Sequence, residues 1–463
     1  MKVNQLKHTI VVSLFLVILA VFLIGPLMED EEQFDPFEEY GIIITLVSYF
    51  LRMLSLSAVP LSVTNFLGII FFNTFPEPPT LKGSPLLAPF ICFRVVTKGD
   101  FPELIKDNLR RNMETCCQAG VDNCMFEIVT DKAIHLARMP GVREIVVPDT
   151  YVTSQGSLFK ARALQYCLED GVNMLNDDDW IVHLDEETLL TKNSAIGIFN
   201  FVTEGSHHFG QGVITYGSGH VVNWVTTLID SVRVAIDYGA LRFCFKVFHK
   251  PIFNWKGSFN VSNVAAERRV NYDHGPEASI AEDCYFGILA SSMGYSFGFV
   301  EGEMNEQSTF TFVDFMRQRR RWAQGIYLAW KSCPVQHQYK AGIFFLVLAI
   351  MFMPMSTVSF IMSLIFPVAA SFPSKIVFGF LGAVFLFLFV FGSVKSLNVH
   401  RLGIIKYSLL CISTVLVIPL AYVLEVTAVL WAIFSNKINF DVVKKERVTG
   451  AKPYSQANPV LLA

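Results

Sequence analysis

Long apolar runs near both ends of the sequence restrict this chain to a membrane-embedded fold. Residues 9–28 contain no charged side chain, and residues 41–72 are interrupted only by Arg52 and Pro60. Further apolar runs cover residues 341–370, 376–393 and 407–434. A helix of about 20 apolar residues crosses the hydrocarbon core of a bilayer. Each run is therefore a candidate membrane span, which agrees with a hydrophobic content of 52%.

The charged residues divide the chain into four parts. We predict an N-terminal membrane region at residues 1–72, with spans at about 9–28 and within 41–72. A domain of mixed charge follows at residues 73–340. A second membrane region covers residues 341–434, and a tail covers residues 435–463. The expected protein is a water-soluble domain inserted between membrane helices.

Basic residues beside the spans predict the orientation, because cytosolic flanks are enriched in lysine and arginine. Lys2 and Lys7 precede the first run, so the N-terminus and, after two spans, residues 73–340 are expected in the cytosol. Lys406 precedes the last apolar run and is expected in the cytosol, and the basic tail after that run also looks cytosolic. A single span between them would instead put Lys406 and the tail on opposite sides of the membrane. Pro419 divides that run, so a re-entrant hairpin is an alternative to a span. The side of the tail stays open.

Cysteine content and net charge give no indication of a disulfide-bonded or nucleic-acid-binding protein. The nine cysteines include no CxxC pair and fall almost entirely in the block assigned to the cytosol, so we expect reduced thiols. The acceptor sequence at Asn260 is expected to carry no glycan for the same reason. A net charge of −3 gives no indication of a nucleic-acid partner.

Strand and helix patterns alternate through the first half of the soluble block. A helix with Asp100 as N-cap is expected to end near Cys117, and a second helix is expected over residues 157–168. Short apolar runs predict strands at residues 89–96, 126–130, 143–148 and 180–185. This alternation is typical of an α/β fold with a parallel sheet and crossover helices.

The strand at residues 180–184 ends at three consecutive acids, Asp185, Glu186 and Glu187. Ligands of open α/β sheets bind at the carboxyl ends of the strands. On an extended strand end, Asp185 and Glu187 would share one face and Glu186 would point away. Two such carboxylates suit a divalent cation, Mn²⁺ or Mg²⁺, that substrate phosphates also hold. A solvated turn that caps the next helix is the alternative.

Other polar residues lie near predicted strand ends or helix starts. Thr97 and Asp131 end two strands, and Lys160, early in its helix, could reach a phosphate. Glu282 and Asp283 open an apolar helix, where the helix dipole alone would explain two acids. Residues 316–325 carry four arginines and Trp322, a composition that also fits an anchor at the membrane interface.

Taken in order, these residues resemble a family pattern. Asp131, Lys160, Asp185-x-Glu187, Glu282-Asp283 and Gln318-Arg-x-Arg-Trp322 follow the order of the inverting membrane glycosyltransferases of family 2, which include cellulose, chitin and hyaluronan synthases. Within that group, most of the chain resembles the invertebrate egghead (BRE-3-type) β-1,4-mannosyltransferases. The segments that carry this resemblance are residues 82–92, 163–170, 180–190 and 248–251.

The resemblance implies a GT-A catalytic domain that transfers mannose from GDP-mannose to glucosylceramide, in the membrane of the endoplasmic reticulum or Golgi. It implies that Asp131 contacts the nucleoside, that Asp185 and Glu187 lie at the metal, and that Asp283 is the catalytic base. It also implies that Gln318, Arg321 and Trp322 border the acceptor and diphosphate site. We add Thr97, Lys160 and Glu282 to the predicted substrate-binding residues. The family's usual Asp-x-Asp is Asp-x-Glu here, which leaves the preferred cation open.

Two other functions remain as alternatives. A processive polysaccharide synthase that uses a UDP-sugar would share the motifs, but about five apolar runs are few for a channel. A non-catalytic membrane scaffold or transporter would not require acids at strand ends. No residue separates GDP-mannose from a UDP-sugar by its chemistry, so the choice of donor rests on the resemblance.

Overall fold

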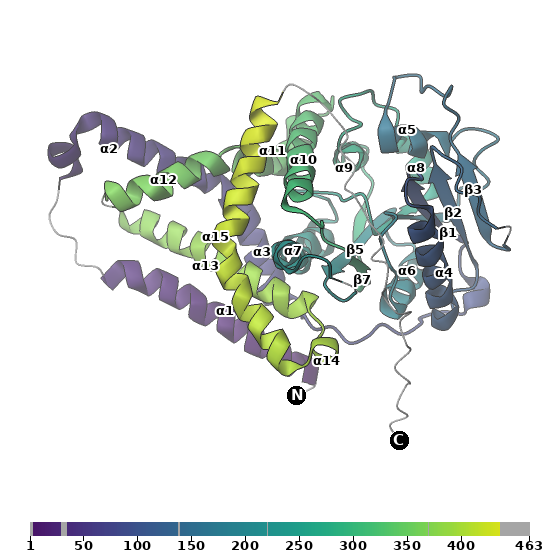
Figure 1. The fold of residues 1–463 in the computed structure, drawn as a ribbon, viewed down its shortest axis with the longest axis horizontal. Coiled ribbons are helices and arrows are strands. Elements are labelled where there is room, and N and C mark those ends of the chain that lie inside the picture. Colours follow the sequence, from purple (N-terminus) through teal and green to yellow (C-terminus); the bar gives the residue numbers. More distant parts are fainter. Residues whose placement is uncertain (1–2, 29–34, 138, 220, 369, 436–463) are drawn as a thin grey trace.

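The computed structural model describes residues 3–28, 35–137, 139–219, 221–368 and 370–435. The molecule is elongated, with a sheet and its covering helices at one end and a bundle of apolar helices at the other (Figure 1). The basic tail residues Lys437, Lys444, Lys445, Arg447 and Lys452 lie outside the described part.

A seven-stranded mixed sheet forms the centre of the first unit, in the order β3-β2-β1-β4-β6-β5-β7. Strand β6 runs antiparallel to β4 and β5, whereas the other neighbouring strands pair in parallel. The strands are β1 (Ile91–Thr97), β2 (Cys124–Thr130), β3 (Val142–Val146), β4 (Trp180–Leu184), β5 (Phe209–Tyr216), β6 (Asn260–Asn263) and β7 (Phe297–Glu306).

The four strands predicted from sequence are confirmed as β1 to β4. All five residues of β4 are buried, because β1 and β6 pair with its two edges and other elements cover the faces of the sheet. The expected N-cap of the next helix is wrong. Helix α4 begins at Pro102 with Phe101 at the cap, and the Asp100 carboxylate instead pairs with Lys132 at 2.5 Å.

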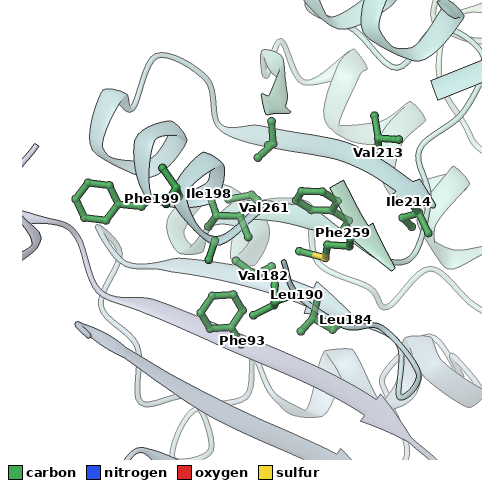
Figure 2. Packing of buried hydrophobic residues seen from close by; sticks show 14 of the residues in the cluster. Phe93, Val182, Leu184, Leu190, Ile198, Phe199, Val213, Ile214, Phe259 and Val261 are labelled. Carbon is green, nitrogen blue, oxygen red and sulfur yellow. The ribbon is translucent and has the colours of Figure 1, made fainter. Parts of the chain in front are cut away.

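The remaining helices of this unit cover the sheet or lie beside it. They are η2 (Pro85–Leu87), α4 (Pro102–Ala119), α5 (Phe159–Tyr166), α6 (Lys192–Glu204), α7 (Trp224–Ile236), η3 (Asp237–Leu241), η4 (Cys244–Phe248), α8 (Val264–Val270), α9 (Glu282–Ser292) and α10 (Phe312–Ser332). Figure 2 shows Phe93 and Val182 of β1 and β4 packing with Phe199 of α6 and Phe259 in one apolar core. Burial of such side chains contributes about 1.5–3 kcal/mol each, which fixes the strand ends in space.

The second unit consists of apolar helices. Its elements are α1 (Val3–Met28), α2 (Pro36–Leu54), η1 (Ser55–Ala58), α3 (Val59–Phe71), α11 (His337–Met351), α12 (Met353–Ile365), α13 (Phe372–Ser396), α14 (Val399–Leu402) and α15 (Ile404–Phe434). Within the described residues, four helical runs are long and apolar enough to cross a membrane, at Val3–Gly25, Pro36–Phe71, Phe372–Ser396 and Ile404–Phe434. Helices α11 and α12 form a further candidate, bent by 50°. The prediction of several helices that are long and apolar enough to cross a membrane is therefore confirmed.

The cysteines agree with the predicted thiols, since all nine lie in the described part and none forms a disulfide. Asn260 is buried in β6, where its side chain contacts Gln211 and the Lys256 carbonyl. The acceptor sequence is therefore inaccessible to a glycan on either side of a membrane.

Candidate active site

One cavity of about 430 Å³ opens at the carboxyl edge of the sheet. Its wall includes residues at or just after the ends of β1, β2, β4 and β7, together with the starts of α5 and α9 and one face of α10. Every residue predicted for the site lines it, namely Thr97, Asp131, Lys160, Asp185, Glu187, Glu282, Asp283, Gln318, Arg321 and Trp322. The fold thus collects residues from 97 to 322 into one chamber.

The acidic segment after β4 does not continue as an extended strand. The chain turns at once, because the Thr188 amide donates to the Asp185 carbonyl at 3.0 Å. Glu186 is only 8% exposed, and its carboxylate accepts from the Thr97 hydroxyl. The expectation that Glu186 points away from the site is therefore wrong: alternation of faces holds only while the backbone is extended. All three acids line the cavity.

Asp131 and Lys160 each have an ionic partner in the cavity. Arg162 donates to the Asp131 carboxylate at 2.7 Å. The Lys160 ammonium donates to Asp185 at 2.7 Å and to the Gly257 carbonyl at 2.9 Å. Burial alone would lower the pKa of Lys160, but the neighbouring carboxylates outweigh it and raise that pKa. Lys160 is therefore a fixed positive charge beside the acidic strand end.

Glu282 and Asp283 begin α9 and also line the cavity. The N-cap of this helix is Ala281, which makes no side-chain cap, and Glu282 lies 3.9 Å from the Lys160 ammonium. Burial, reinforced by Asp283, raises the pKa of Glu282 to about 7. Burial also raises the pKa of Asp283, although Lys160 and Arg321 oppose the shift. A raised pKa makes Asp283 a stronger base than an ordinary carboxylate, which the helix dipole alone does not explain.

Helix α10 contributes the other wall. Gln318, Arg321 and Trp322 are spaced i, i+3 and i+4, so they share the face of the helix that lines the cavity. The Trp322 ring lies between two guanidinium groups, with Arg233 at 4.4 Å and Arg319 at 4.3 Å from its centroid. Tertiary packing against α7 therefore places the Trp322 side chain in the cavity wall.

Three further cavity residues were not predicted from sequence. Glu306 ends β7, and its carboxylate accepts from the Thr188 hydroxyl at 2.7 Å. The strand-end rule that found Asp185 would also have found Glu306. Arg233 on α7 and Lys256 before β6 carry no local signal, and Lys256 forms an ion pair with buried Asp237. Only the fold brings these two cations to the cavity.

The residues fit a divalent cation held jointly with a ligand. Asp185 and Glu187 supply hard oxygen donors, and Asp185 raises the pKa values of both Asp283 and Glu306, after burial. Carboxylates that raise one another's pKa are stabilised by an added positive charge. No group of three or more His, Cys, Asp or Glu side chains within the described residues is close enough to hold a metal by itself. A cation here would need further oxygens from a bound molecule, as a diphosphate provides.

The cavity wall also includes apolar side chains. Leu61 of α3, Ile326 of α10, and Leu346 and Ile350 of α11 line it. Two of these helices belong to the apolar bundle. One chamber is thus lined both by the charged strand edge and by apolar side chains of the helix bundle.

Comparison with known proteins identifies the family. The pattern "Glycosyl transferase family group 2" matches residues 180–434. The β-1,4-mannosyltransferase egh of Drosophila melanogaster is 49% identical over 95% of this chain and 97% of its own length. The β-1,4-mannosyltransferase bre-3 of Caenorhabditis elegans is 50% identical over 89% of this chain and 91% of its own length.

The chain belongs to the β-1,4-mannosyltransferases of glycosyltransferase family group 2. The predicted family and the GT-A fold class are thereby confirmed, and the protein is a hexosyltransferase. Among solved structures, the mannosyltransferase PcManGT of Pyrobaculum calidifontis, in complex with GDP-Man and Mn²⁺, matches with 14% identity and a TM-score of 0.49, over 84% of this chain and 100% of its own. This likeness is too weak to transfer a ligand or a metal to the β-1,4-mannosyltransferase described here.

Proposed function

We propose that the protein transfers mannose from GDP-mannose to glucosylceramide with inversion, forming a β-1,4-mannosyl-glucosylceramide. The observation that carries this proposal is that one cavity is lined both by acids at the strand ends and by side chains of the apolar helix bundle. A nucleotide sugar suits the acids, and the hydrocarbon of a lipid acceptor suits the apolar side chains. The names of the close relatives support the sugar and the linkage.

The charged half of the cavity would hold the donor. Asp131 and Thr97 lie at neighbouring strand ends, where the nucleoside of an α/β protein binds. Asp185 and Glu187 would hold Mn²⁺ or Mg²⁺ against the diphosphate, and the cation would neutralise negative charge on the leaving group. Lys160, Gln318 and Arg321 would contact the phosphates or the sugar from the opposite walls.

Asp283 would act as the general base. It would accept the proton of the acceptor hydroxyl as the oxygen attacks the anomeric carbon and the bond to the diphosphate oxygen breaks. Attack from the face opposite the leaving group inverts the anomeric configuration. Glu282, with a pKa raised to about 7, would bind an acceptor hydroxyl beside it. Arg321 would stabilise charge that develops on the diphosphate.

The ceramide chains would lie against the apolar side chains of the cavity wall. Leu61, Ile326 and Leu346 come from helices at the boundary between the two units, so a lipid sugar could reach Asp283 while its chains stay in the bilayer. The basic residues at 317–321 support a cytosolic catalytic domain over residues 73–340. We place the protein in the endoplasmic reticulum or Golgi membrane on the resemblance alone.

The test supplies glucosylceramide to membranes that contain the protein, together with labelled GDP-mannose, UDP-glucose or UDP-N-acetylglucosamine. Label should enter the lipid extract from GDP-mannose alone, and membranes with Asp283→Asn should give little of it. Label from a UDP-sugar in a water-insoluble polymer would instead support the processive synthase. Equal labelling with and without glucosylceramide would exclude this acceptor.

A further inference from the structure

Helix α15 looks like a membrane span by length and composition alone. It has 31 residues, and most of its exposed side chains are aliphatic. A helix rises about 1.5 Å per residue, so α15 is roughly 46 Å long, whereas the hydrocarbon core is about 30 Å thick. If α15 crossed the bilayer, its two ends would lie on opposite surfaces.

The first end of α15 lies against the catalytic unit. The Lys406 ammonium is 4.9 Å from the Trp224 ring at the start of α7. Eight residues later, the Thr414 hydroxyl contacts Ser393 at 2.7 Å, and Ser393 contacts Ser231 of α7 at 2.9 Å. Arg401, just before α15, donates to the Ser218 carbonyl beyond β5 at 2.8 Å.

The second end of α15 lies against the same unit. The Gln324 side-chain amide donates to the carbonyls of Ala432 and Ser435 at 3.0 and 3.1 Å. The Arg320 guanidinium is 4.5 Å from the Trp431 ring centroid. Between these contacts and the first end, Arg319 pairs with Glu425 at 2.7 Å.

The two anchoring helices form one layer. Arg319 of α10 pairs with Asp230 of α7, and Trp322 of α10 stacks on Arg233 of α7. The side chains of Asp230, Arg233 and Trp322 line the catalytic cavity. Both ends of α15 are therefore held by the layer that walls the cavity, which a helix crossing the bilayer could not achieve. Figure 1 shows α15, in yellow, running across the direction of α1, α2 and α13.

The outer face of α15 identifies what covers it. Exposed aliphatic side chains recur every three or four residues along its length, at Ile405, Leu409, Ile412, Leu416, Leu420 and Val423. The opposite side is buried against the protein through Ala421, Leu424 and Ala428. A continuous apolar face next to membrane helices fits lipid, and a helix in the interface plane buries such a face at the boundary of headgroups and acyl chains.

We propose that α15 lies in the plane of the membrane, with its exposed aliphatic face in the leaflet next to the catalytic cavity. The chain then leaves α15 on the same side as the catalytic domain. This arrangement accounts for basic residues on both sides of the helix, at Lys406 before it and in the tail after it. Through Arg319 and Gln324, the helix holds α10 and its cavity face against the lipid surface. The inference is independent of the donor and the acceptor.

The first test compares epitopes in sealed vesicles that contain the full chain. One epitope is placed at the C-terminus, a second in the exposed turn at Gly171, and a third at residues 29–34 between α1 and α2. We expect external protease either to cleave both the C-terminal and the Gly171 epitopes or to leave both intact. The epitope at residues 29–34 should show the opposite result. Opposite fates for the C-terminal and Gly171 epitopes would overturn the proposal. If both were protected, the cytosolic orientation would fail while the in-plane helix would stand.

The second test measures depth in the bilayer. Spin labels are attached to cysteines introduced at Ile405, Leu416 or Leu430, in a background where exposed Cys117 is serine. Collision with oxygen and with a water-soluble nickel complex reports how deep each label lies. An in-plane helix gives three similar, shallow depths. A crossing helix would make Leu416 much the deepest and would overturn the proposal, and a label at Val17 of α1 supplies the deep reference.

Discussion

The two walls of the cavity differ in the kind of structure that positions their side chains. One wall consists of strand ends, where Thr97, Asp131 and Asp185 follow apolar β-strands. The other consists of helices α7 and α10, where Arg233 and Trp322 meet through tertiary packing. A strand delivers the residue after it to a fixed edge of the sheet, whereas a helix presents a residue to the cavity only if the whole helix is docked at the right rotation.

Because of this difference, we expect donor binding and acceptor binding to depend on different walls. The strand-end wall carries the acids that suit a cation and a diphosphate, and it should govern the donor. On the helical wall, Gln318 and Arg321 would reach the phosphates or sugar of the donor. The apolar side chains of that wall, Trp322 and Ile326, should govern the lipid acceptor. The following variants test that division, in order of decreasing effect.

The largest effect is expected for Asp185→Ala in the strand-end wall. Removal of this carboxylate should abolish transfer and weaken cation-dependent binding of GDP-mannose, because it deprives the cation of a ligand. Glu187→Asp should retain partial activity with an altered preference between Mn²⁺ and Mg²⁺. The measurements are transfer rate and donor affinity across a series of cations. Normal donor binding by Asp185→Ala would contradict the assignment of the donor to this wall.

Asp283→Asn should lower turnover by about 10²–10⁴-fold, the usual contribution of a general base. Donor affinity should remain near that of the unchanged protein, because other residues hold the diphosphate. Glu282→Gln is the matched control and should lose less. Rate and affinity measured on the same preparation decide the outcome. Near-normal transfer by Asp283→Asn would exclude this residue as the base.

Trp322→Leu tests the helical wall. The ring stacks on two guanidinium groups, and each such contact contributes about 0.5–2 kcal/mol to the packing of this wall. Loss of the ring should displace the wall that contacts the acceptor, so we expect the KM for glucosylceramide to rise by roughly 2–30-fold while donor affinity stays constant. Tyr327→Leu on the same helix, outside the cavity wall, is the control. An equal loss of donor affinity in Trp322→Leu would remove the distinction between the walls.

Glu186→Ala tests the contact between the Glu186 carboxylate and the Thr97 hydroxyl, which the sequence analysis did not predict. The variant should lower the Tm because the Thr97 hydroxyl loses its acceptor, a change that costs about 1–3 kcal/mol for a buried group. Adding Thr97→Val should recover only part of the Tm, since it removes the unsatisfied hydroxyl but also the oxygen that accepts from the Gly99 amide at 3.0 Å. A wild-type Tm for Glu186→Ala would restore the original prediction of an inert, outward-pointing side chain.

The smallest effect is a pH shift. Lys160 lowers the pKa of both Glu282 and Asp283, against the upward effect of burial. In Lys160→Met those pKa values should rise, so the base becomes protonated at a higher pH. The acid limb of the kcat/KM profile should therefore move to higher pH. The pH profile of Lys256→Met is the control, since Lys256 pairs with Asp237 instead. A limb that moved to lower pH would contradict this electrostatic account.

Much of the strand-end wall could be predicted because its signals are local. An apolar run such as residues 180–184 identifies a buried strand, and the polar residue that follows must lie at the edge of the sheet. The same reasoning failed at Glu186, where the backbone turned one residue earlier than assumed. It gave no sign of Arg233 or Lys256, because a cation on a helix or in a loop has the same local pattern whether it faces a cavity or water.

Local patterns in the sequence identify the segments that avoid water, the strands β1 to β4 and the acids that follow β4, because hydropathy and periodicity are properties of neighbouring residues. The strands β5, β6 and β7 were not predicted. The direction of each helix depends instead on tertiary contacts. The apolar run at residues 407–434 was expected to cross the membrane or fold back within it, and only its contacts with α7 and α10 distinguish a third arrangement. Apolar composition specifies burial in lipid but no direction relative to the bilayer, and direction comes from the partners at both ends of a helix.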